Sequence, residues 1–246
     1  MYDDIADYYD LIYADWEGSM HRHGAAISEI LGVDPQSSRI LDVAAGIGTQ
    51  SLALASLGYS VVARDLSPAA IARLAREAEA RGLSIDSAQC DMRNASASVN
   101  GTFDAVIAFD NSIPHLQSDD EILRAFQGFV PLLRPGGVVL ISVRDYEQVD
   151  PATSHVPHGV RSRGEGQYRM SQHWTWLSQT HYRTTMVVEE IRGDKWVELI
   201  RSDALYYAVS TGRLLALMRE SGLDARRVDE VAFFQPVLSG RAAHHQ

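Results

Sequence analysis

Glycine and acidic residues follow the first two predicted strands of this sequence. The run Leu41–Thr49 reads as a buried strand that passes through a glycine-containing turn into a helix. Gly46 and Gly48 have no Cβ, so the backbone there can approach a ligand closely. Asp65 ends the next strand, 23 positions after Asp42. Nucleotide-binding sheets place a carboxylate on ribose hydroxyls at an offset of about 20 residues, so this pattern predicts a site for a nucleoside.

Two more acids follow the next two strands. Asp91 and Met92 come after the third strand, and Asp110 and Asn111 come after the fourth. Ligands of open α/β sheets bind at the carboxyl ends of the strands. We therefore expect the four acids to converge on one crevice; they are Asp42, Asp65, Asp91 and Asp110.

Alternating elements predict the fold that positions these acids. From Arg39 to Tyr146, short apolar runs alternate with helical stretches, including helices over 68–81 and about 119–133 and a turn at Pro135–Gly137. This order is typical of a doubly wound α/β fold. Residues from about 151 to 207 read as antiparallel strands, followed by a helix over 211–221 and two closing strands. We predict a seven-stranded, mostly parallel sheet with an antiparallel β insertion after the fifth strand.

The whole chain is expected to form a single domain. Its parts are a helical lid over 1–35, a cofactor-binding core over 36–147, an insertion for the substrate over 148–207, and a closing helix and strands over 208–241. The helical spacing of Ile5, Tyr8, Tyr9, Ile12 and Tyr13 supports a helix in the first part.

Composition limits the partners. A hydrophobic share of 46% and a charged share of 22% suit one globular domain. A net charge of −10 disfavours nucleic acid as a substrate. We expect no membrane span and a cytoplasmic protein, and the lone Cys90 argues against a disulfide framework or a thiolate metal cluster. A homo-oligomer stays open, and the terminal pair His244 and His245 is not interpreted as a metal site.

Taken together, residues 39–145 and the closing strands resemble the class I S-adenosylmethionine-dependent methyltransferases, which have a Rossmann-like fold. The resemblance implies S-adenosylmethionine as the cofactor and no metal. Asp65 would hold its ribose diol, Leu66 and Met92 would sandwich adenine, and Asp91 would bond the adenine amine. Residues after the first strand would line the methionine part; they are Asp42, Ala44, Gly46 and Gly48. Many members carry glycine where this chain has Ala44.

Two short segments resemble glycine and glycine/sarcosine N-methyltransferases. They are Asp110–Leu116 and Ile141–Tyr146. The resemblance implies that Arg144 holds a substrate carboxylate, that Asn111 lies beside the amine, and that Tyr146 belongs to the same site. A guanidinium suits this role because it forms bidentate hydrogen bonds with a carboxylate and keeps its charge. The alternative is that Arg144 forms a surface ion pair with Asp145, Glu147 or an N-terminal acid.

Other candidates each have a structural alternative. The position of Arg22 resembles that of an arginine whose side chain, in this family, reaches the cofactor carboxylate. It equally suits a solvated helix face. His115 could act as a base or could fix its loop. Tyr8, Tyr9 and Tyr13 could close the pocket or could pack as core. Tryptophans of the insertion could shape the acceptor site or form the core of a small sheet; they are Trp174, Trp176 and Trp196.

The sequence therefore predicts methyl transfer to a small molecule, with the amine of glycine or sarcosine as the first choice. Such a reaction needs positioning more than a dedicated catalytic group, with Asn111, Tyr13 and His115 as candidates. Another small acceptor stays open: an amino sugar, a phenol or a carboxylate. An NAD-linked oxidoreductase is disfavoured by Ser51 at the third glycine position of the dinucleotide fingerprint, and by a single lysine, Lys195. A non-catalytic binding module is the third alternative.

Overall fold

The computed structural model describes residues 1–150 and 152–242, and its main sheet has seven strands in the order β10-β11-β5-β4-β1-β2-β3. The first five strands pair in parallel, whereas β11 runs antiparallel to both of its neighbours, β5 and β10. The predicted doubly wound, mostly parallel sheet is confirmed. The strands are β1 (Arg39–Asp42), β2 (Ser60–Asp65), β3 (Asp86–Gln89), β4 (Phe103–Ala108), β5 (Leu133–Ser142), β10 (Leu223–Val228) and β11 (Val237–Ala242).

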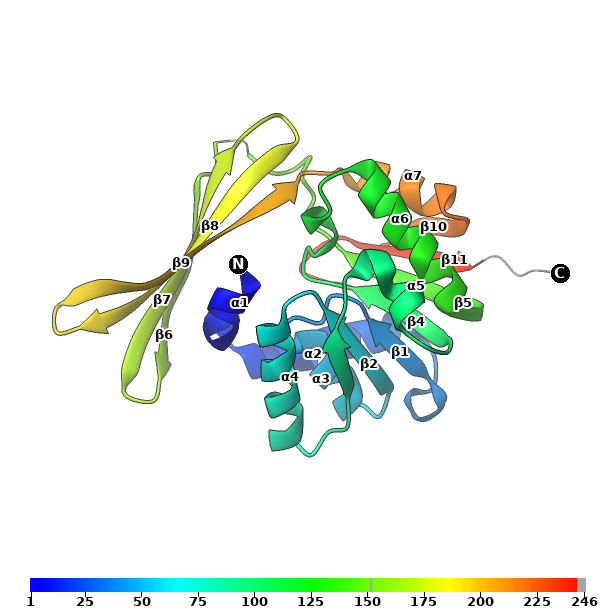
Figure 1. Cartoon of the computed structure of the whole chain (residues 1–246), viewed down its shortest axis with the longest axis horizontal. Coiled ribbons are helices and arrows are strands. Elements are labelled where there is room, and N and C mark those ends of the chain that lie inside the picture. The colour runs from blue at the N-terminus through cyan, green and yellow to red at the C-terminus, as the bar shows by residue number, and fades with distance from the viewer. Residues whose placement is uncertain (151, 243–246) are drawn as a thin grey trace.

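Helices cover both faces of this sheet (Figure 1). Ile40 and Ile107 pack with residues of α2 and α3, while Leu41 and Val106 pack with residues of α6 and α7. Successive residues of a strand point to opposite faces, so a sheet buried on both sides has continuous apolar strands. No helix in the described ranges is long and apolar enough to cross a membrane. The helices are α2 (Trp16–Leu31), α3 (Thr49–Ser56), α4 (Pro68–Ala80), α5 (Ala95–Ser98), α6 (Asp119–Phe129) and α7 (Thr211–Glu220).

Prolines and glycines move some element boundaries away from the prediction. Helix α6 ends at Phe129, because Pro131 cannot donate a backbone hydrogen bond, and the 3₁₀ turn η5 (Val130–Leu132) follows it. The expected turn at 135–137 lies inside β5 instead, where Gly136 has a φ of +76° and the pairing with β4 shifts register. The last strand likewise begins only after Pro236.

The N-terminal residues form a short helix and a 3₁₀ helix rather than one α-helix. They are α1 (Tyr2–Ile5) and η1 (Ala6–Ile12). Helix α2 begins at Trp16, because the side chain of the preceding Asp15 caps it and accepts a hydrogen bond from the Gly18 backbone N–H at 2.9 Å. Three other 3₁₀ turns are η2 (Pro35–Ser37), η3 (Met92–Asn94) and η4 (Ile113–His115).

The predicted insertion is a four-stranded antiparallel sheet that follows β5. Its strands are β6 (His155–Arg163), β7 (Gly166–Trp176), β8 (His181–Arg192) and β9 (Lys195–Tyr207). Met170, Met186 and Val188 of this sheet pack against Ile5 and Leu11. Residues 1–13, which we call the N-terminal segment, therefore lie between the insertion and the core (Figure 1).

The close approach of α2 to α3 gives a stability prediction. A Cβ added at Gly24 would lie 2.9 Å from the Cβ of Ala53, whereas one at Gly128 of α6 would make only ordinary contacts, the nearest at 3.7 Å. Alanine normally stabilises a helix interior relative to glycine by about 1 kcal/mol. We expect Gly24→Ala to lower the free energy of unfolding by about 1 to 3 kcal/mol, because the helices must separate.

Urea denaturation measures both variants, with Gly128→Ala as the matched control. The control should be as stable as the unsubstituted protein, or more stable by up to about 1 kcal/mol. A Gly24→Ala protein of unchanged or increased stability would show that α2 and α3 are not in close contact.

Candidate functional site

A cavity of about 480 Å³ opens at the carboxyl ends of the parallel strands. The strand order reverses between β4 and β1, and open α/β sheets bind ligands at such a point. The wall also includes Tyr2, Tyr9 and Tyr13 of the N-terminal segment and Leu205 of the insertion. Seven residues expected at the cofactor line it: Ala44, Gly46, Asp65, Leu66, Asp91, Met92 and Asp110.

The turn after β1 is fixed from behind by Asp42. This side chain is 1% exposed, and its two oxygens accept hydrogen bonds from the Ala44 N–H at 3.2 Å and the Ser51 hydroxyl at 2.8 Å. Burial raises the pKa of Asp42 to about 7, although both hydrogen bonds act in the opposite direction. Gly48 has a φ of +101° at the start of α3 and packs near Leu74. Asp42 and Gly48 therefore shape the turn but do not line the cavity.

Gly46 is the open part of this turn. Its φ is +52°, and a Cβ there would meet no atom within 4 Å. Its N–H donates a 2.8 Å hydrogen bond to Asp65 Oδ2, and the Ser67 N–H donates to Asp65 Oδ1. Burial raises the pKa of Asp65, although these hydrogen bonds act in the opposite direction. Each carboxylate oxygen has a second lone pair, so Asp65 can still accept a bond from a ligand.

Apolar and charged side chains form the far rim of the cavity. Leu66 is 62% exposed, which is unusual for so large an apolar side chain, and Met92 lies on the same wall. The hydrogen bonds from Arg93 lower the pKa of Asp91, and the guanidinium Nε lies 3.0 Å and 3.1 Å from the two carboxylate oxygens. Arg93 therefore competes with any ligand that would bond the Asp91 side chain.

Asp110 and Asn111 have strained backbones after β4. Their φ values are +56° and +63°, in the region that non-glycine residues rarely adopt. Tyr13 donates a 2.6 Å hydrogen bond to Asp110 Oδ2, and Gln50 donates another at 3.0 Å. Asp110 Oδ1 is buried without a partner among the described residues. Buried polar atoms are nearly always satisfied, so this oxygen is a candidate acceptor for a donor on a bound ligand.

Neither Arg22 nor the neighbouring His23 of α2 lines the cavity. Arg22 is exposed, does not line the cavity, and donates to the Ser19 hydroxyl at 3.0 Å. His23 is buried, and its Nδ1 lies 3.1 Å from Gln50, which also bonds Asp110. Adjacent residues of a helix point about 100° apart, so the two side chains cannot share one face.

The three residues expected to bind the substrate form a connected group behind the cavity wall. Asn111 donates to the Tyr146 hydroxyl at 2.9 Å and accepts from the Arg144 backbone N–H at 2.9 Å. The Arg144 guanidinium lies 4.5 Å from the ring of Trp174 and donates to Tyr182 at 3.2 Å. Within the described residues no carboxylate lies in ion-pair range of Arg144, so the alternative of a surface ion pair does not apply there.

His115 lines the cavity and lies in an aromatic environment. Its Nε2 is 2.9 Å from the Tyr2 hydroxyl, and its ring lies 4.2 Å from that of Tyr206. Burial lowers the pKa of His115 to about 4, so the imidazole is neutral near pH 7. Sequence reasoning did not single out Tyr2, Gln50, Tyr182 or Tyr206. No local pattern marks these side chains, because only the fold brings them here.

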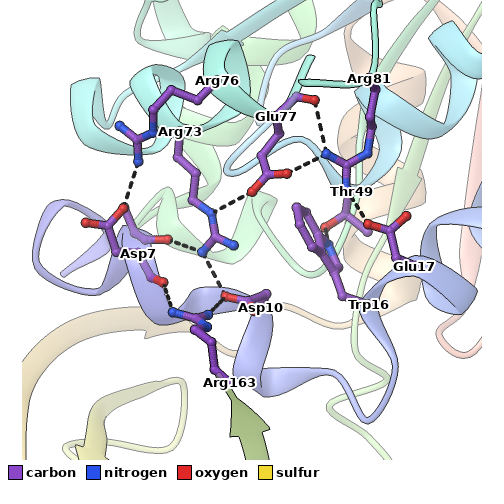
Figure 2. Close-up of polar contacts among 11 residues, drawn as sticks. Asp7, Asp10, Trp16, Glu17, Thr49, Arg73, Arg76, Glu77, Arg81 and Arg163 are labelled. Carbon is purple, nitrogen blue, oxygen red and sulfur yellow. Dashed lines mark hydrogen bonds and ion pairs between the residues drawn. The ribbon is translucent and has the colours of Figure 1, made fainter. Parts of the chain in front are cut away.

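Ion pairs join the N-terminal segment to both neighbouring parts (Figure 2). Arg73 of α4 donates to Asp10 Oδ1 at 2.8 Å and to the Ala6 carbonyl at 2.7 Å. Arg163 of β6 also pairs with Asp10 and donates to the Asp7 carbonyl. Burial alone would raise the pKa of Asp10, but the bonds from Arg163 and Arg73 outweigh it and lower that pKa.

Comparisons with known proteins identify the core. Residues 40–137 match the family described as methyltransferase domain. This part of the chain is a methyltransferase domain. The resemblance to class I methyltransferases is thereby confirmed at the level of the domain, and S-adenosylmethionine as the cofactor agrees with it.

The matches to curated relatives are longer than the match to that domain. A glycine/sarcosine N-methyltransferase of Parasynechococcus marenigrum (strain WH8102) is 31% identical over 157 residues, which cover 64% of this chain and 55% of the relative. Another of Halorhodospira halochloris is 30% identical over 130 residues, covering 53% of this chain and 48% of the relative. The chain thus spans about half the length of these relatives.

Solved structures of other proteins share nearly the whole fold. DesVI of Streptomyces venezuelae has a TM-score of 0.79 at 21% identity and covers 98% of this chain and 99% of its own. CalS10 of Micromonospora echinaspora, described as an amino pentose methyltransferase bound to S-adenosylmethionine, has a TM-score of 0.76 at 18% identity over 93% of this chain and 94% of its own. At these identities the likeness confirms the Rossmann-like methyltransferase fold.

The buried carboxylate of Asp42 gives a pH prediction. A pKa raised above the unfolded value means that its contribution to stability is full at low pH and is lost as pH rises from about 4 through 7. The asparagine side chain of an Asp42→Asn variant cannot ionise. We compare the free energies of unfolding of this variant and of the unsubstituted protein, both free of ligand. We expect the difference to shift by about 2 to 4 kcal/mol in favour of the variant between about pH 4.5 and about pH 8.

Urea denaturation at the two pH values measures this difference. Asp194→Asn, in the exposed turn between β8 and β9, is the control and should change stability equally at both pH values. A pH-independent difference for Asp42→Asn would show that Asp42 ionises normally in the folded protein.

The Asp10 ion pairs give a prediction about the N-terminal segment. Asp10→Asn removes the negative charge that pairs with Arg73, whose side chain is 9% exposed, at 2.8 Å, and leaves Glu77 at 3.5 Å as the remaining ion-pair partner of that arginine. We expect opening of the segment to become easier by about 1 to 3 kcal/mol, so that its amides exchange hydrogen about 10- to 100-fold faster. Exchange in β1 and β4 should stay unchanged.

Asp7→Asn is the matched control in the same 3₁₀ helix. The Asp7–Arg76 pair is 74% and 63% exposed, and exposed pairs contribute little. Its exchange rates should change less than about threefold. Equal effects of the two substitutions would mean that the buried pair does not hold the segment.

Proposed function

We propose that this chain transfers the methyl group of S-adenosylmethionine to the amine of a small amino acid such as glycine or sarcosine. The methyltransferase domain and the two glycine/sarcosine N-methyltransferases that it resembles support the reaction. The observation that carries the choice of acceptor is the guanidinium of Arg144. It is half-buried beside Asn111, and no acid in the described part of the chain pairs with it.

The cavity suits the proposed cofactor. The open turn at Gly46 and the free lone pairs of Asp65 would receive its sugar, and Leu66 and Met92 offer apolar surfaces to adenine. The unpartnered Asp110 Oδ1 would accept a bond from the amino group of its methionine part. Arg93 would share Asp91 with the adenine amine.

The acceptor would bind between the guanidinium of Arg144 and the side-chain oxygen of Asn111. Arg144 would hold the carboxylate, with Trp174 and Tyr182 fixing the plane of the guanidinium. Asn111 Oδ1, which already accepts from the Arg144 backbone, would orient the amine with its remaining lone pair. A carboxylate and an amine on adjacent carbons match this arrangement.

Positioning would account for most of the rate. When bound, the sulfonium of the cofactor supplies an activated methyl group. The residues of this chain hold the amine as a neutral nucleophile in line with it, and such orientation contributes up to about 7 to 11 kcal/mol. His115 is a weak base near pH 7, since its pKa is about 4. The N-terminal segment and the insertion would exclude water.

A neutral amino sugar is the second candidate acceptor. The observation in its favour is that CalS10, with nearly the same fold, is described as an amino pentose methyltransferase. Such an acceptor has no carboxylate for Arg144. The two acceptors therefore differ in their dependence on that residue.

Calorimetric titration with S-adenosylhomocysteine, followed by glycine or sarcosine, tests the proposal. We expect micromolar binding of S-adenosylhomocysteine that Asp65→Asn weakens about 10- to 100-fold. We expect a second signal from the amino acid that Arg144→Met abolishes, since methionine keeps the packing against Trp174 and removes the charge. Asp65→Asn is the matched control for this second signal, because at saturating S-adenosylhomocysteine it should leave the amino-acid binding intact.

Each other outcome has a defined meaning. Binding of NAD in place of S-adenosylhomocysteine would overturn the methyltransferase function. Binding of S-adenosylhomocysteine without any amino-acid signal, together with methylation of an amino sugar, would replace the acceptor.

A further inference from the structure

A chain of hydrogen bonds runs behind the cavity wall from α2 to Asp110. The side-chain nitrogen of Gln50 lies 3.0 Å from Asp110 Oδ2 and 3.1 Å from His23 Nδ1. Gln50 and His23 are only 4% and 8% exposed, so water has little access to either side chain. Gln50 and Asp110 line the cavity, and His23 is connected to it through Gln50.

The carboxylate of Asp110 fixes which way the Gln50 amide points. An ionised carboxylate can only accept hydrogen bonds, and Asp110 Oδ2 also accepts one from the Tyr13 hydroxyl at 2.6 Å. The Gln50 atom that faces it must therefore be the NH₂ group and not the carbonyl oxygen. The same nitrogen faces His23 Nδ1 with its second hydrogen, so Nδ1 must present a lone pair. The imidazole is then neutral and carries its proton on Nε2.

Aromatic rings enclose the His23 imidazole on its other sides. Phe233 and Phe234, from the loop between β10 and β11, have ring centroids 4.8 Å and 4.9 Å from that of His23, and Phe234 is stacked on it. The ring of Tyr13 meets it edge-on at 6.4 Å. These rings offer no carboxylate to a protonated imidazole, so packing favours the neutral form.

Two charged side chains act on this imidazole. Burial is the main cause that lowers the pKa of His23, and the positive charge of Arg22 acts in the same direction. The negative charge of Asp110 opposes both. The neutral form that the hydrogen bonds require is thus also the form that burial favours near pH 7.

Loss of the acceptor on His23 would reach the cavity through Gln50. With a proton on Nδ1, the imidazole and the Gln50 NH₂ group would face each other as two donors. A half-turn of the amide would restore that bond, but it would set the Gln50 oxygen against Asp110 Oδ2, and two acceptors repel each other. In either case Asp110, whose φ of +56° is rarely adopted by a non-glycine residue, loses a donor that holds it.

We propose that His23 is a positioning residue for the cofactor, which holds the Gln50 amide as a donor to Asp110. The inference rests on the proposed function, in which the unpartnered Asp110 Oδ1 accepts a bond from the amino group of the methionine part. Gln50 and Tyr13 together fix Oδ2, so Oδ1 stays available for that amino group. His23 acts through Gln50 and makes no contact with the cofactor itself.

Titration of His23 variants with S-adenosylhomocysteine tests this inference without catalysis. We expect His23→Leu, which has no acceptor, to weaken binding about 3- to 10-fold near pH 7. His23→Asn can place its carbonyl oxygen near the position of Nδ1 and should recover most of that loss. Asparagine does not titrate, so the affinity of the unsubstituted protein should fall relative to that of His23→Asn as pH decreases below the ordinary histidine pKa of about 6.5.

His21→Leu is the matched control. His21 lies on the same helix and is exposed, so this variant should keep the affinity for S-adenosylhomocysteine within about twofold. Unchanged affinity in His23→Leu would overturn the inference and leave the proposed function intact. A protein that binds no S-adenosylhomocysteine at all would overturn both.

Nitrogen-15 NMR of the histidine rings tests the tautomer in the ligand-free protein. The His23 signals are those that disappear in His23→Asn. Near pH 7 we expect a neutral ring that is protonated on Nε2, because Nδ1 must accept from Gln50. A ring protonated on Nδ1, or on both nitrogens, would overturn the inference whatever the protein binds.

Discussion

The carboxylate of Asp10 binds Arg73 of the core and Arg163 of the insertion, so one residue joins three parts of the molecule. The N-terminal segment that carries it packs on Met170 and Met186 of the insertion. The same segment contributes Tyr2, Tyr9 and Tyr13 to the cavity wall. Because these tyrosines depend on where the segment lies, the ion pairs of Asp10 help to fix the shape of the cavity wall.

Charges within the site are separated by the fold. The carboxyl ends of the strands supply acceptors, namely the carboxylates of Asp65 and Asp110, while the insertion side supplies Arg144 and the donors near it. Among the described residues no ion pair neutralises Asp65, Asp110 or Arg144, so the folded protein bears the cost of burying them. A positively charged cofactor and an acceptor with a carboxylate would each relieve part of that cost, which gives a physical reason for the proposed pairing of ligands.

The match to the methyltransferase domain ends at residue 137. Arg144, Trp174 and Tyr182 lie after it, and the N-terminal segment lies before it. The residues to which we assign acceptor binding in the proposed function therefore lie, except for Asn111, outside the part of the chain that matches the family. The expected division of the chain into lid, core, insertion and closing elements stays a prediction, as do the roles of the individual site residues.

The sequence alone determined the sheet and one side of the site, because apolar periodicity fixes strands and helices locally and the carboxyl ends of parallel strands must converge. Asp65 and Asp110 were predictable in this way, and the resemblance to the methyltransferase family added Leu66 and Met92. Only the tertiary structure decided that Arg22 does not line the cavity, that Asp42 supports the turn from behind, and that Tyr2 of the N-terminal segment reaches the cavity wall. These positions follow from contacts between segments far apart in the chain and from a helix phase that no local pattern encodes.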